Sequence, residues 1–286
     1  MSTEHGKLYV VATPIGNLDD VSPRAGRVLA QASVIAAEDT RHSARLLQHL
    51  GISTALVACH DHNERVVVDV LIARLLRGDD VALISDAGTP LLNDPGYLLV
   101  SQAHARGIEV VSIPGPSAIT AALSICGLPV NRFAFEGYLP EKSAARRTLL
   151  QQLAHEARTL VFFETPHRIE RALRDLVTIF GSERRATIAR EMTKRFETVR
   201  RDTLASLLAW VRAGAERQRG EFVIVVEGSV AAPGPDDAGL QRMLDVLLKR
   251  LSVKDAAAVA ADLTGRNRNE LYRLALKINR RDEGEK

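Results

Sequence analysis

Cysteine is scarce in this chain, and the marks of membrane insertion and secretion are missing. Two cysteines, Cys59 and Cys126, occur among 286 residues, and neither has the neighbours that a zinc site requires. No segment approaches the roughly 18 consecutive apolar residues of a membrane-spanning helix. Met1 to Lys7 is too polar for a signal peptide. We therefore expect a cytoplasmic protein with no membrane contact.

Several common cofactor motifs are also absent. There is no G-x-x-x-x-G-K-[ST] phosphate loop, no G-x-G-x-x-G dinucleotide fingerprint and no G-x-S-x-G nucleophile turn. His60 and His62 could bind a metal together with Asp61, Asn63 and Glu64, but no Cys or His cluster has the spacing of a zinc site, and we predict no metal. Hydrophobic residues make up 46% of the chain and charged residues 26%, a composition typical of a globular protein. A net charge of +3 permits a nucleic-acid partner without establishing one.

The first half of the chain alternates short apolar runs with helical segments. This alternation predicts a parallel sheet covered on both faces, because crossover helices join parallel strands. The five predicted strands are 8–12, 34–37, 55–59, 81–84 and 110–113. Each ends in a loop rich in Gly, Pro, Asp or His, as in "ISDAGTPLLNDPG" after the fourth strand. Since such loops meet at one edge of a parallel sheet, they predict a ligand-binding cleft.

The second half predicts a mixed sheet and then a basic helical tail. Strands 186–189 and 196–200 have no helix between them, which favours antiparallel pairing. Residues 231–237 have the composition of a linker. From Gly239 to Arg281 there are ten Lys or Arg residues against four Asp or Glu. The two short helices predicted around Gly265 could simply carry a solvent-exposed charged face, or they could form a helix-turn-helix-like unit that binds phosphate groups. We favour the second interpretation, with a nucleic acid as the partner.

These patterns predict an α/β protein with three parts. The predicted boundaries are an N-terminal α/β domain over 1–118, a second mixed α/β domain over 119–230, and a linker with a basic helical tail over 231–286. The cations that we expect to contact RNA lie in the tail. They are Arg266, Arg268, Arg273, Lys277, Arg280 and Arg281.

Nine segments, in unbroken order over residues 10–228, resemble one family. They are "VATPIGNLDD", "AAEDTRHSARLL", "HDHNE", "ISDAGTPLLNDPG", "IPGPSAITAAL", "FEGYLP", "FFETPHRI", "AREMTKRFE" and "GEFVIVVEG". Together they resemble the tetrapyrrole methylase family of S-adenosylmethionine-dependent enzymes, in its branch that methylates ribosomal RNA. The resemblance implies a two-domain tetrapyrrole-methylase-like fold, S-adenosyl-L-methionine as methyl donor and a homodimer. It also implies methylation of the ribose 2'-hydroxyl of a cytidine in the decoding region of 16S ribosomal RNA, on the 30S subunit.

The resemblance further implies which residues touch the methyl donor. They come from the loops after the first, fourth and fifth strands and from two segments of the second domain. They are Ile15, Gly16, Asp86, Gly88, Thr89, Pro90, Gly115, Ser117, Ala118, Phe163, Arg190, Glu191 and Met192. Gly88 would allow close backbone approach. For Asp94, Pro95 and Gly96 we favour a plain turn that starts the next helix.

Methyl transfer to a ribose needs alignment of the reacting atoms and a base, or a cation that acidifies the hydroxyl. The candidate catalytic residues are Glu38, Asp39, His60, Asp61 and Lys194, with Glu64, Glu164 and Glu191 as further possible bases and Arg41, Arg168 and Arg190 as further cations. Each could instead be a structural ion pair, and the sequence does not assign the base. One alternative is an enzyme that methylates a small tetrapyrrole, and the basic tail argues against it. Another is an RNA-binding module without a cofactor, and the presence of Gly88, Gly115 and Ser117 argues against that.

Overall fold

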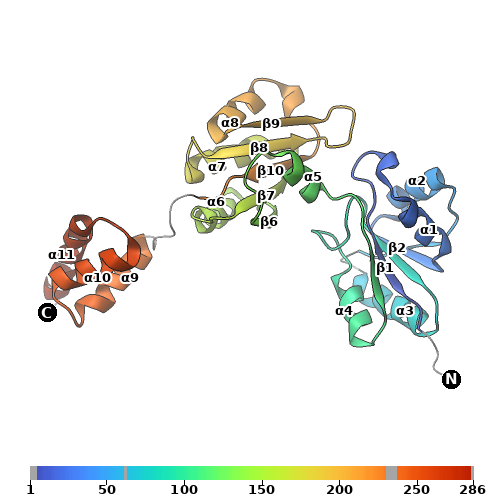
Figure 1. Cartoon of the computed structure of the whole chain (residues 1–286), viewed down its shortest axis with the longest axis horizontal. Coiled ribbons are helices and arrows are strands. Elements are labelled where there is room, and N and C mark those ends of the chain that lie inside the picture. Colours follow the sequence, from blue (N-terminus) through green and yellow to red (C-terminus); the bar gives the residue numbers. More distant parts are fainter. Residues whose placement is uncertain (1–4, 61–62, 230–236, 285–286) are drawn as a thin grey trace. The chain divides into compact units, whose positions relative to one another are not determined.

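The computed structural model describes residues 5–60, 63–229 and 237–284, without the side chains of 237, 238 and 280–284. The chain forms two compact units, one of Met1–Ala154 with Arg158–Glu227 and the other of His155–Ala157 with Gly228–Lys286. The larger unit holds two five-stranded sheets and the smaller one a helical tail (Figure 1). Within the described ranges, no helix has both the length and the apolar character needed to cross a membrane.

The first sheet is entirely parallel, as predicted, with strand order β3-β2-β4-β1-β5. Its strands are β1 (Leu8–Val11), β2 (Val34–Ala37), β3 (Leu56–Ala58), β4 (Val81–Ile84) and β5 (Val110–Ile113). The helices between them are α1 (Pro23–Gln31), α2 (Thr40–Leu50), α3 (Glu64–Leu76) and α4 (Tyr97–Ala105), with a short 3-10 turn, η1 (Leu18–Asp20). Helices α1 and α2 pack on one face of this sheet and α3 and α4 on the other, so the strands β2 and β4 are fully buried, while β3 and β5 are partly exposed.

The second sheet is mixed, as predicted, with strand order β6-β7-β10-β8-β9. Only β6 and β7 run parallel; the other neighbours are antiparallel. Its strands are β6 (Phe133–Tyr138), β7 (Thr159–Glu164), β8 (Arg185–Arg190), β9 (Thr198–Thr203) and β10 (Phe222–Val226). The associated helices are α5 (Ala118–Ile125), α6 (Ser143–Leu153), α7 (Ile169–Phe180) and α8 (Leu204–Arg212), with the 3-10 turn η2 (Ala215–Gln218).

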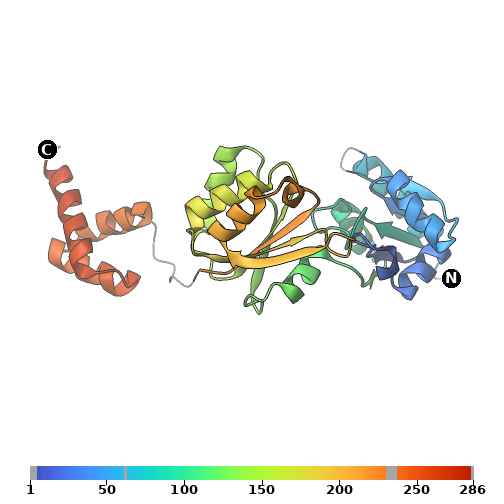
Figure 2. The ribbon, with the colours of Figure 1, turned by 90° about the horizontal axis from the view of Figure 1, so that it is seen from above.

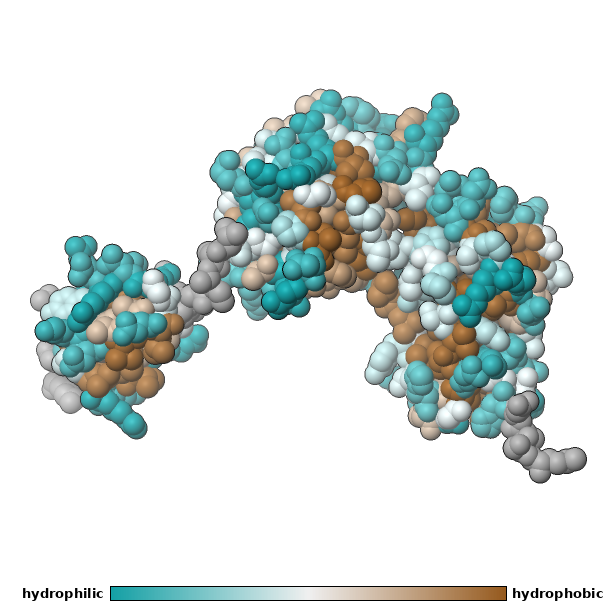
Figure 3. Space-filling model, viewed as in Figure 1, coloured by the Kyte–Doolittle hydropathy of each residue, from teal (hydrophilic) through white to brown (hydrophobic). Residues whose placement is uncertain are grey.

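Helix α5 is the element that ties the two sheets together. It follows β5 of the first sheet, yet it packs against β10 of the second. Helices α6, α7 and α8 cover the opposite face of the second sheet (Figure 2). Ile15 from the first sheet's loops joins Ile119 of α5 and Met192 in the core beneath α5. Hydrophobic residues are also visible on the surface around α5 and the second sheet (Figure 3).

Local sequence signals account for many element ends. Ser22 caps α1 by accepting a hydrogen bond from the N–H of Ala25, and Gly51 ends α2 in the left-handed conformation. Asp39 caps α2, so this helix begins at Thr40. Helix α5 was not predicted from the sequence, and strand β9 lies at Thr198–Thr203, later than the predicted 196–200.

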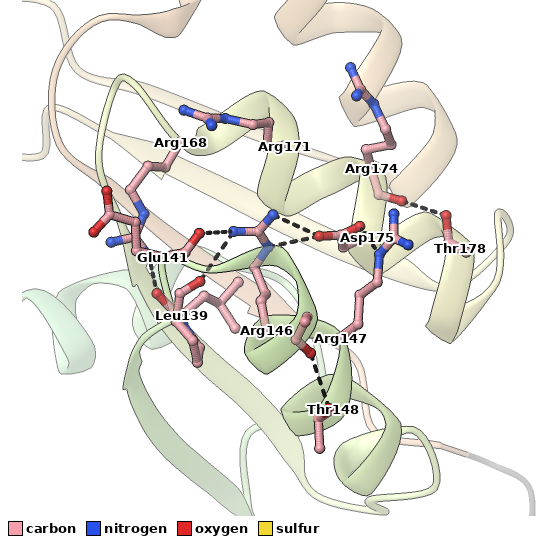
Figure 4. Close-up of polar contacts among 12 residues, drawn as sticks. Leu139, Glu141, Arg146, Arg147, Thr148, Arg168, Arg171, Arg174, Asp175 and Thr178 are labelled. Carbon is pink, nitrogen blue, oxygen red and sulfur yellow. Dashed lines mark hydrogen bonds and ion pairs between the residues drawn. The ribbon is translucent and has the colours of Figure 1, made fainter.

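A buried ion pair lies between α6 and α7. The side chains of Arg146 and Asp175 are both 3% exposed, and Arg146 Nε lies 2.8 Å from Asp175 Oδ2 (Figure 4). Arg146 also donates to the carbonyls of Pro140 and Glu141, at 3.1 Å each. Arg147 Nε binds the other carboxylate oxygen at 2.8 Å. Burial alone would raise the pKa of Asp175, but the bonds from the two guanidinium groups outweigh it and hold this pKa below its usual value.

The tail contains three helices. They are α9 (Asp237–Leu248), α10 (Val253–Thr264) and α11 (Arg268–Gly284). Leu240, Leu244, Ala260 and Leu271 contribute to their shared core. Gly265, at φ +68°, ends α10 and separates it from α11, as the sequence predicted. The last helix spans 17 residues, so the prediction that both helices around Gly265 are short was wrong for α11.

Candidate functional site

Strand order brings three predicted donor loops together. Strand β1 lies between β4 and β5, so the loops after these strands are neighbours at the carboxyl edge of the sheet. The first and fourth loops are joined directly, because the N–H of Thr13 donates to the Gly88 carbonyl at 2.8 Å and the N–H of Gly88 donates back at 3.0 Å. The hydroxyl of Thr89 donates to the Pro116 carbonyl at 3.1 Å, which joins the fourth loop to the fifth.

A cavity of about 190 Å³ lies where these loops meet the second sheet. From the first sheet's loops and α5 it is lined by Ile15, Asp86, Ala87, Gly88, Thr89, Leu92, Asn93, Asp94, Ser117, Ala118 and Ile119. From the second sheet it is lined by Tyr138, Phe163, Glu164, Met192, Glu221, Phe222 and Val223. Phe163 makes an edge-on contact with Tyr138, with ring centroids 5.6 Å apart. The cavity thus has apolar and aromatic walls with a small set of polar groups, as ligand sites usually do.

Eight of the thirteen residues predicted to touch the donor line this cavity. They are Ile15, Asp86, Gly88, Thr89, Ser117, Ala118, Phe163 and Met192. Five do not: Gly16, Pro90, Gly115, Arg190 and Glu191. Pro90 is buried within the fourth loop, and Gly115 packs on the first strand's end, where an added Cβ would lie 3.1 Å from the Cβ of Ala12.

Gly88 is surrounded by other loops of the site. At φ +85° it occupies a backbone region that other residues rarely adopt. A Cβ added there would lie 3.3 Å from Ile15 Cγ2 and 3.7 Å from the Pro116 carbonyl oxygen. The missing side chain therefore lets the first, fourth and fifth loops approach one another.

Lys194 contacts the site through an acidic residue. Its ammonium nitrogen lies 3.0 Å from Glu191 Oε1 and 2.9 Å from Glu221 Oε2, and Glu221 lines the cavity. Burial would lower the pKa of Lys194, but the two carboxylates outweigh it and raise this pKa. The stem of Lys194 lies against Gly16, where an added Cβ would be 2.6 Å from Lys194 Cγ. Gly16 therefore makes room for the lysine.

Of the other candidate bases, Glu164 lines the cavity, but Glu38, Asp39 and His60 do not. Asp39 caps α2 and pairs with Arg41 at 3.2 Å; its side-chain hydrogen bond to Arg41 holds its pKa below the usual value. The N–H of Asp39 donates to Asp86 Oδ1 at 3.0 Å, so Asp39 contacts the site through its backbone. Glu38 and His60 lie outside the lining, and Asp61 lies outside the described residues.

Four carboxyl groups line the cavity, and their partners differ. Glu164 is 1% exposed and lies 3.1 Å from Arg168 Nε, while burial raises its pKa. Its second oxygen, Oε2, is buried without a hydrogen-bond donor in the described structure. Glu221 pairs with Lys194. Asp86 and Asp94 form no ion pair with any described residue, so the cavity favours a positively charged ligand.

The sequence reasoning missed several lining residues. Asp94 was interpreted as part of a turn; Gly96 does lie directly before α4, but Asp94 lines the cavity. Tyr138, Glu221 and Val223 come from strands β6 and β10 or their ends; they lie in the segments "FEGYLP" and "GEFVIVVEG", but they were not predicted to touch the donor. The aromatic residue in "FEGYLP" was the available signal for Tyr138.

The predicted RNA-binding cations lie in and beside α11. Arg268, Arg273 and Lys277 are exposed. Arg266 is half-buried and lies 4.0 Å from Glu270. The side chains of Arg280 and Arg281 lie outside the described residues.

Residues 7–208 match the family described as Tetrapyrrole (Corrin/Porphyrin) Methylases, and the chain belongs to this family. Residues 234–279 match a second family, described as the RsmI C-terminal HTH domain. A protein of Pseudomonas aeruginosa named ribosomal RNA small subunit methyltransferase I is 56% identical over 274 residues, which cover 95% of this chain and 97% of that protein. A protein of the same name from Xylella fastidiosa strain Temecula1 is 52% identical over 272 residues, with 95% and 99% covered.

The fold also resembles that of solved methyltransferases. One is the uroporphyrin-III C-methyltransferase of Thermus thermophilus complexed with S-adenyl homocysteine. The TM-score is 0.53 at 17% identity, with 78% of this chain and 97% of that chain covered. At this identity the likeness concerns the fold, and it agrees with the two sheets described above.

Proposed function

We propose that this chain is an S-adenosylmethionine-dependent methyltransferase of ribosomal RNA. The proposed acceptor is the ribose 2'-hydroxyl of a cytidine in the decoding region of 16S ribosomal RNA, on the 30S subunit. The observation that carries the proposal is the cavity: three neighbouring loops of a parallel sheet meet the wall of a second sheet in a chain of this family. The names of the relatives that match nearly its full length support RNA as the substrate.

The residues that line the cavity suit the charge and chemistry of the proposed donor. When bound, S-adenosylmethionine supplies a methyl group attached to a positively charged sulfur. Asp86 lies at the end of β4 and can accept hydrogen bonds from amino or hydroxyl groups, while the aromatic and aliphatic walls near Phe163 and Met192 suit a nucleoside. The carboxyl groups around the cavity attract a positively charged ligand.

The protein's main catalytic task in this proposal is positioning. Methyl transfer by direct displacement requires the acceptor oxygen, the methyl carbon and the sulfur to lie in line. The bonds between Thr13 and Gly88 and between Thr89 and Pro116 hold the loops of the cavity in one arrangement. Lys194 and Glu191 fix Glu221 at the opposite wall, since Glu191 also accepts the N–H of Glu221 at 3.0 Å.

The test is methyl transfer with labelled donor to purified 30S subunits, followed by mass mapping of the modified nucleotide. We expect one 2'-O-methylated cytidine in 16S ribosomal RNA. Uroporphyrinogen is tested as a second substrate. Methylation of uroporphyrinogen and not of RNA would refute the proposal and indicate a tetrapyrrole methyltransferase. We further propose a homodimer in the cytoplasm; a monomeric mass in light scattering would refute the dimer.

A further inference from the structure

The loop between β4 and α4 holds its backbone in conformations that residues with side chains rarely adopt. Leu91 and Asn93 have φ values of +71° and +69°, and Gly88 and Gly96 have +85° and +121°. Such conformations cost of order 1–3 kcal/mol at a residue other than glycine, and they persist where the surrounding structure enforces them. Asp94 directly follows Asn93 in this loop, and it lines the cavity.

Contacts from three elements fix the position of this loop. Glu64 of α3 accepts the N–H groups of Gly96 and Leu98 at 3.1 and 3.3 Å. At the other end, Gly88 is paired with Thr13. In the middle, Asn93 packs on β6, where a Cβ added to Gly137 would lie 2.9 Å from Asn93 Oδ1. These contacts fix the loop, and the loop holds the carboxyl group of Asp94 at the cavity wall.

Asp94 differs from the other carboxyl groups of the cavity. Glu164 is compensated by Arg168 and Glu221 by Lys194, and Asp86 accepts the N–H of Asp39. Burial, followed by the nearby charge of Asp86, raises the pKa of Asp94 to about 6, although a bond from Ser85 acts in the opposite direction. A carboxylate with these properties is charged at neutral pH and accepts a proton more readily than an exposed one.

On the basis of the function proposed above, we propose that Asp94 is the general base that removes the proton from the acceptor ribose hydroxyl. A carboxylate oxygen of Asp94 takes the proton while the ribose oxygen forms its bond to the methyl carbon and the bond from that carbon to sulfur breaks. The products are the methyl ether, the neutral thioether and a protonated Asp94, which then releases its proton to water. Glu38, Asp39 and His60 lie outside the lining, and Glu164, which does line the cavity, is paired with Arg168, so Asp94 is the carboxylate that we assign as the base.

The proposal predicts a pH dependence with a defined sign. Asp94 must be ionised to act, so the transfer rate is constant well above its pKa and falls about tenfold per pH unit below it. The other charged or titratable groups at the cavity are Asp86 in the same loop, Tyr138 from β6, Glu164 with Arg168 from β7 and its end, and Glu221 with Lys194 beside β10.

The experiment compares wild-type protein with Asp94→Asn and Asp94→Glu in single-turnover methyl transfer to 30S subunits between pH 5 and 8. We expect Asp94→Asn to lower the rate by about 10²-fold or more at neutral pH and to remove the acid limb of the pH profile. Asp94→Glu should recover part of the rate and keep the limb. The affinity for S-adenosylhomocysteine, measured by calorimetry, should remain within about threefold. Asp69→Asn, an exposed carboxylate on α3, is the control and should behave as wild type.

A readout without turnover completes the test. Carbon-13 NMR of aspartate-labelled protein should contain a carboxyl resonance that titrates near pH 6 and is absent from Asp94→Asn. A rate within threefold of wild type, a retained acid limb, or lost donor affinity in folded Asp94→Asn would each overturn the assignment. Failure of the wild type itself to methylate 30S subunits would instead refute the proposed function, and the base with it.

Discussion

Gly88 shows how a single missing side chain positions three loops. Its backbone pairs with Thr13, and the space beside its Cα is filled by Ile15 and the Pro116 carbonyl. A glycine is needed both for the positive φ angle and for the close packing. The same residue thus determines whether the first, fourth and fifth loops can meet around a ligand.

We predict that Gly88→Val abolishes S-adenosylmethionine binding while the protein remains folded, because a side chain there displaces Ile15. Calorimetry beside a thermal melt is the measurement. Gly107→Val is the matched control: Gly107 also has a positive φ of +68°, but nothing lies within 4 Å of an added Cβ. Both variants should lose about 1–3 kcal/mol of stability to backbone strain. Wild-type affinity in folded Gly88→Val would contradict the prediction.

The position of Asp94 at the cavity could not be predicted from the sequence. Asp-Pro-Gly is a common turn sequence, and Gly96 lies directly before α4, so the interpretation as a segment that leads into the next helix was correct for the backbone. Asp94 lines the cavity from a loop in which Leu91 and Asn93 adopt left-handed conformations, and no local pattern predicts these at non-glycine residues. Tyr138 and Glu221 are similar cases, since only the packing of two sheets brings them to the loops.

Among the elements, α6 and α7 depend on a buried charge cluster. Asp175 accepts bonds from both Arg146 and Arg147, and the first of these arginines is buried with it. Removing one member of such a pair leaves an uncompensated buried charge, which costs more than the pair contributes. The cluster therefore fixes how the two helices pack.

We predict that Asp175→Asn destabilises the protein by about 3–5 kcal/mol in urea unfolding. Glu170→Gln on the same helix should cost under about 1 kcal/mol, because the partners of Glu170, Arg174 and Arg212, are about half exposed. Since the pKa of Asp175 is lowered on folding, its contribution is complete above the unfolded value of about 3.8 and is lost as the pH falls through the folded value. Equal stability losses in the two variants would contradict this account.

The sequence predicted elements best where a pattern was local. Runs such as Val81 to Ile84, uniformly apolar and bounded by turn residues, were identified with their observed limits. Helix α5 was missed because "AITAALSI" follows a Gly-Pro loop and was interpreted as part of that loop, although Ile119, Ala122 and Leu123 recur at helical spacing. It is hydrophobic because it packs between loops of the first sheet and β10, an arrangement that sequence alone does not reveal.

At the scale of the whole molecule, the cavity and the exposed cations of the tail belong to different compact units. The larger unit contains the cavity and four of the five described cores, and the smaller unit has a core of its own. The exposed cations Arg268, Arg273 and Lys277 belong to the smaller unit. We expect the tail to bind RNA phosphates without taking part in the chemistry.

We predict that truncation after Gly228 leaves donor affinity unchanged and weakens binding to 30S subunits. Each lost phosphate contact should reduce the salt slope of log K by roughly 0.7 to 0.9. Binding assays over a range of salt concentrations measure both quantities. A full-length variant with Arg268, Arg273 and Lys277 changed to Gln is the control for loss of fold, and it should reproduce part of the effect. Unchanged affinity and slope in the truncated protein would assign the tail another role.

The core beneath α5 links ligand binding in the cavity to the stability of the folded protein. Ile15, Ile119, Met192 and Val223 belong both to the core that joins the two sheets and to the lining of the cavity. A ligand in the cavity would extend this core, so it would favour the folded state over the unfolded one by mass action. At one hundred times its dissociation constant, such a ligand adds about 2.7 kcal/mol to the free energy of unfolding. The cellular supply of the methyl donor would then set how long the protein survives as well as how fast it works.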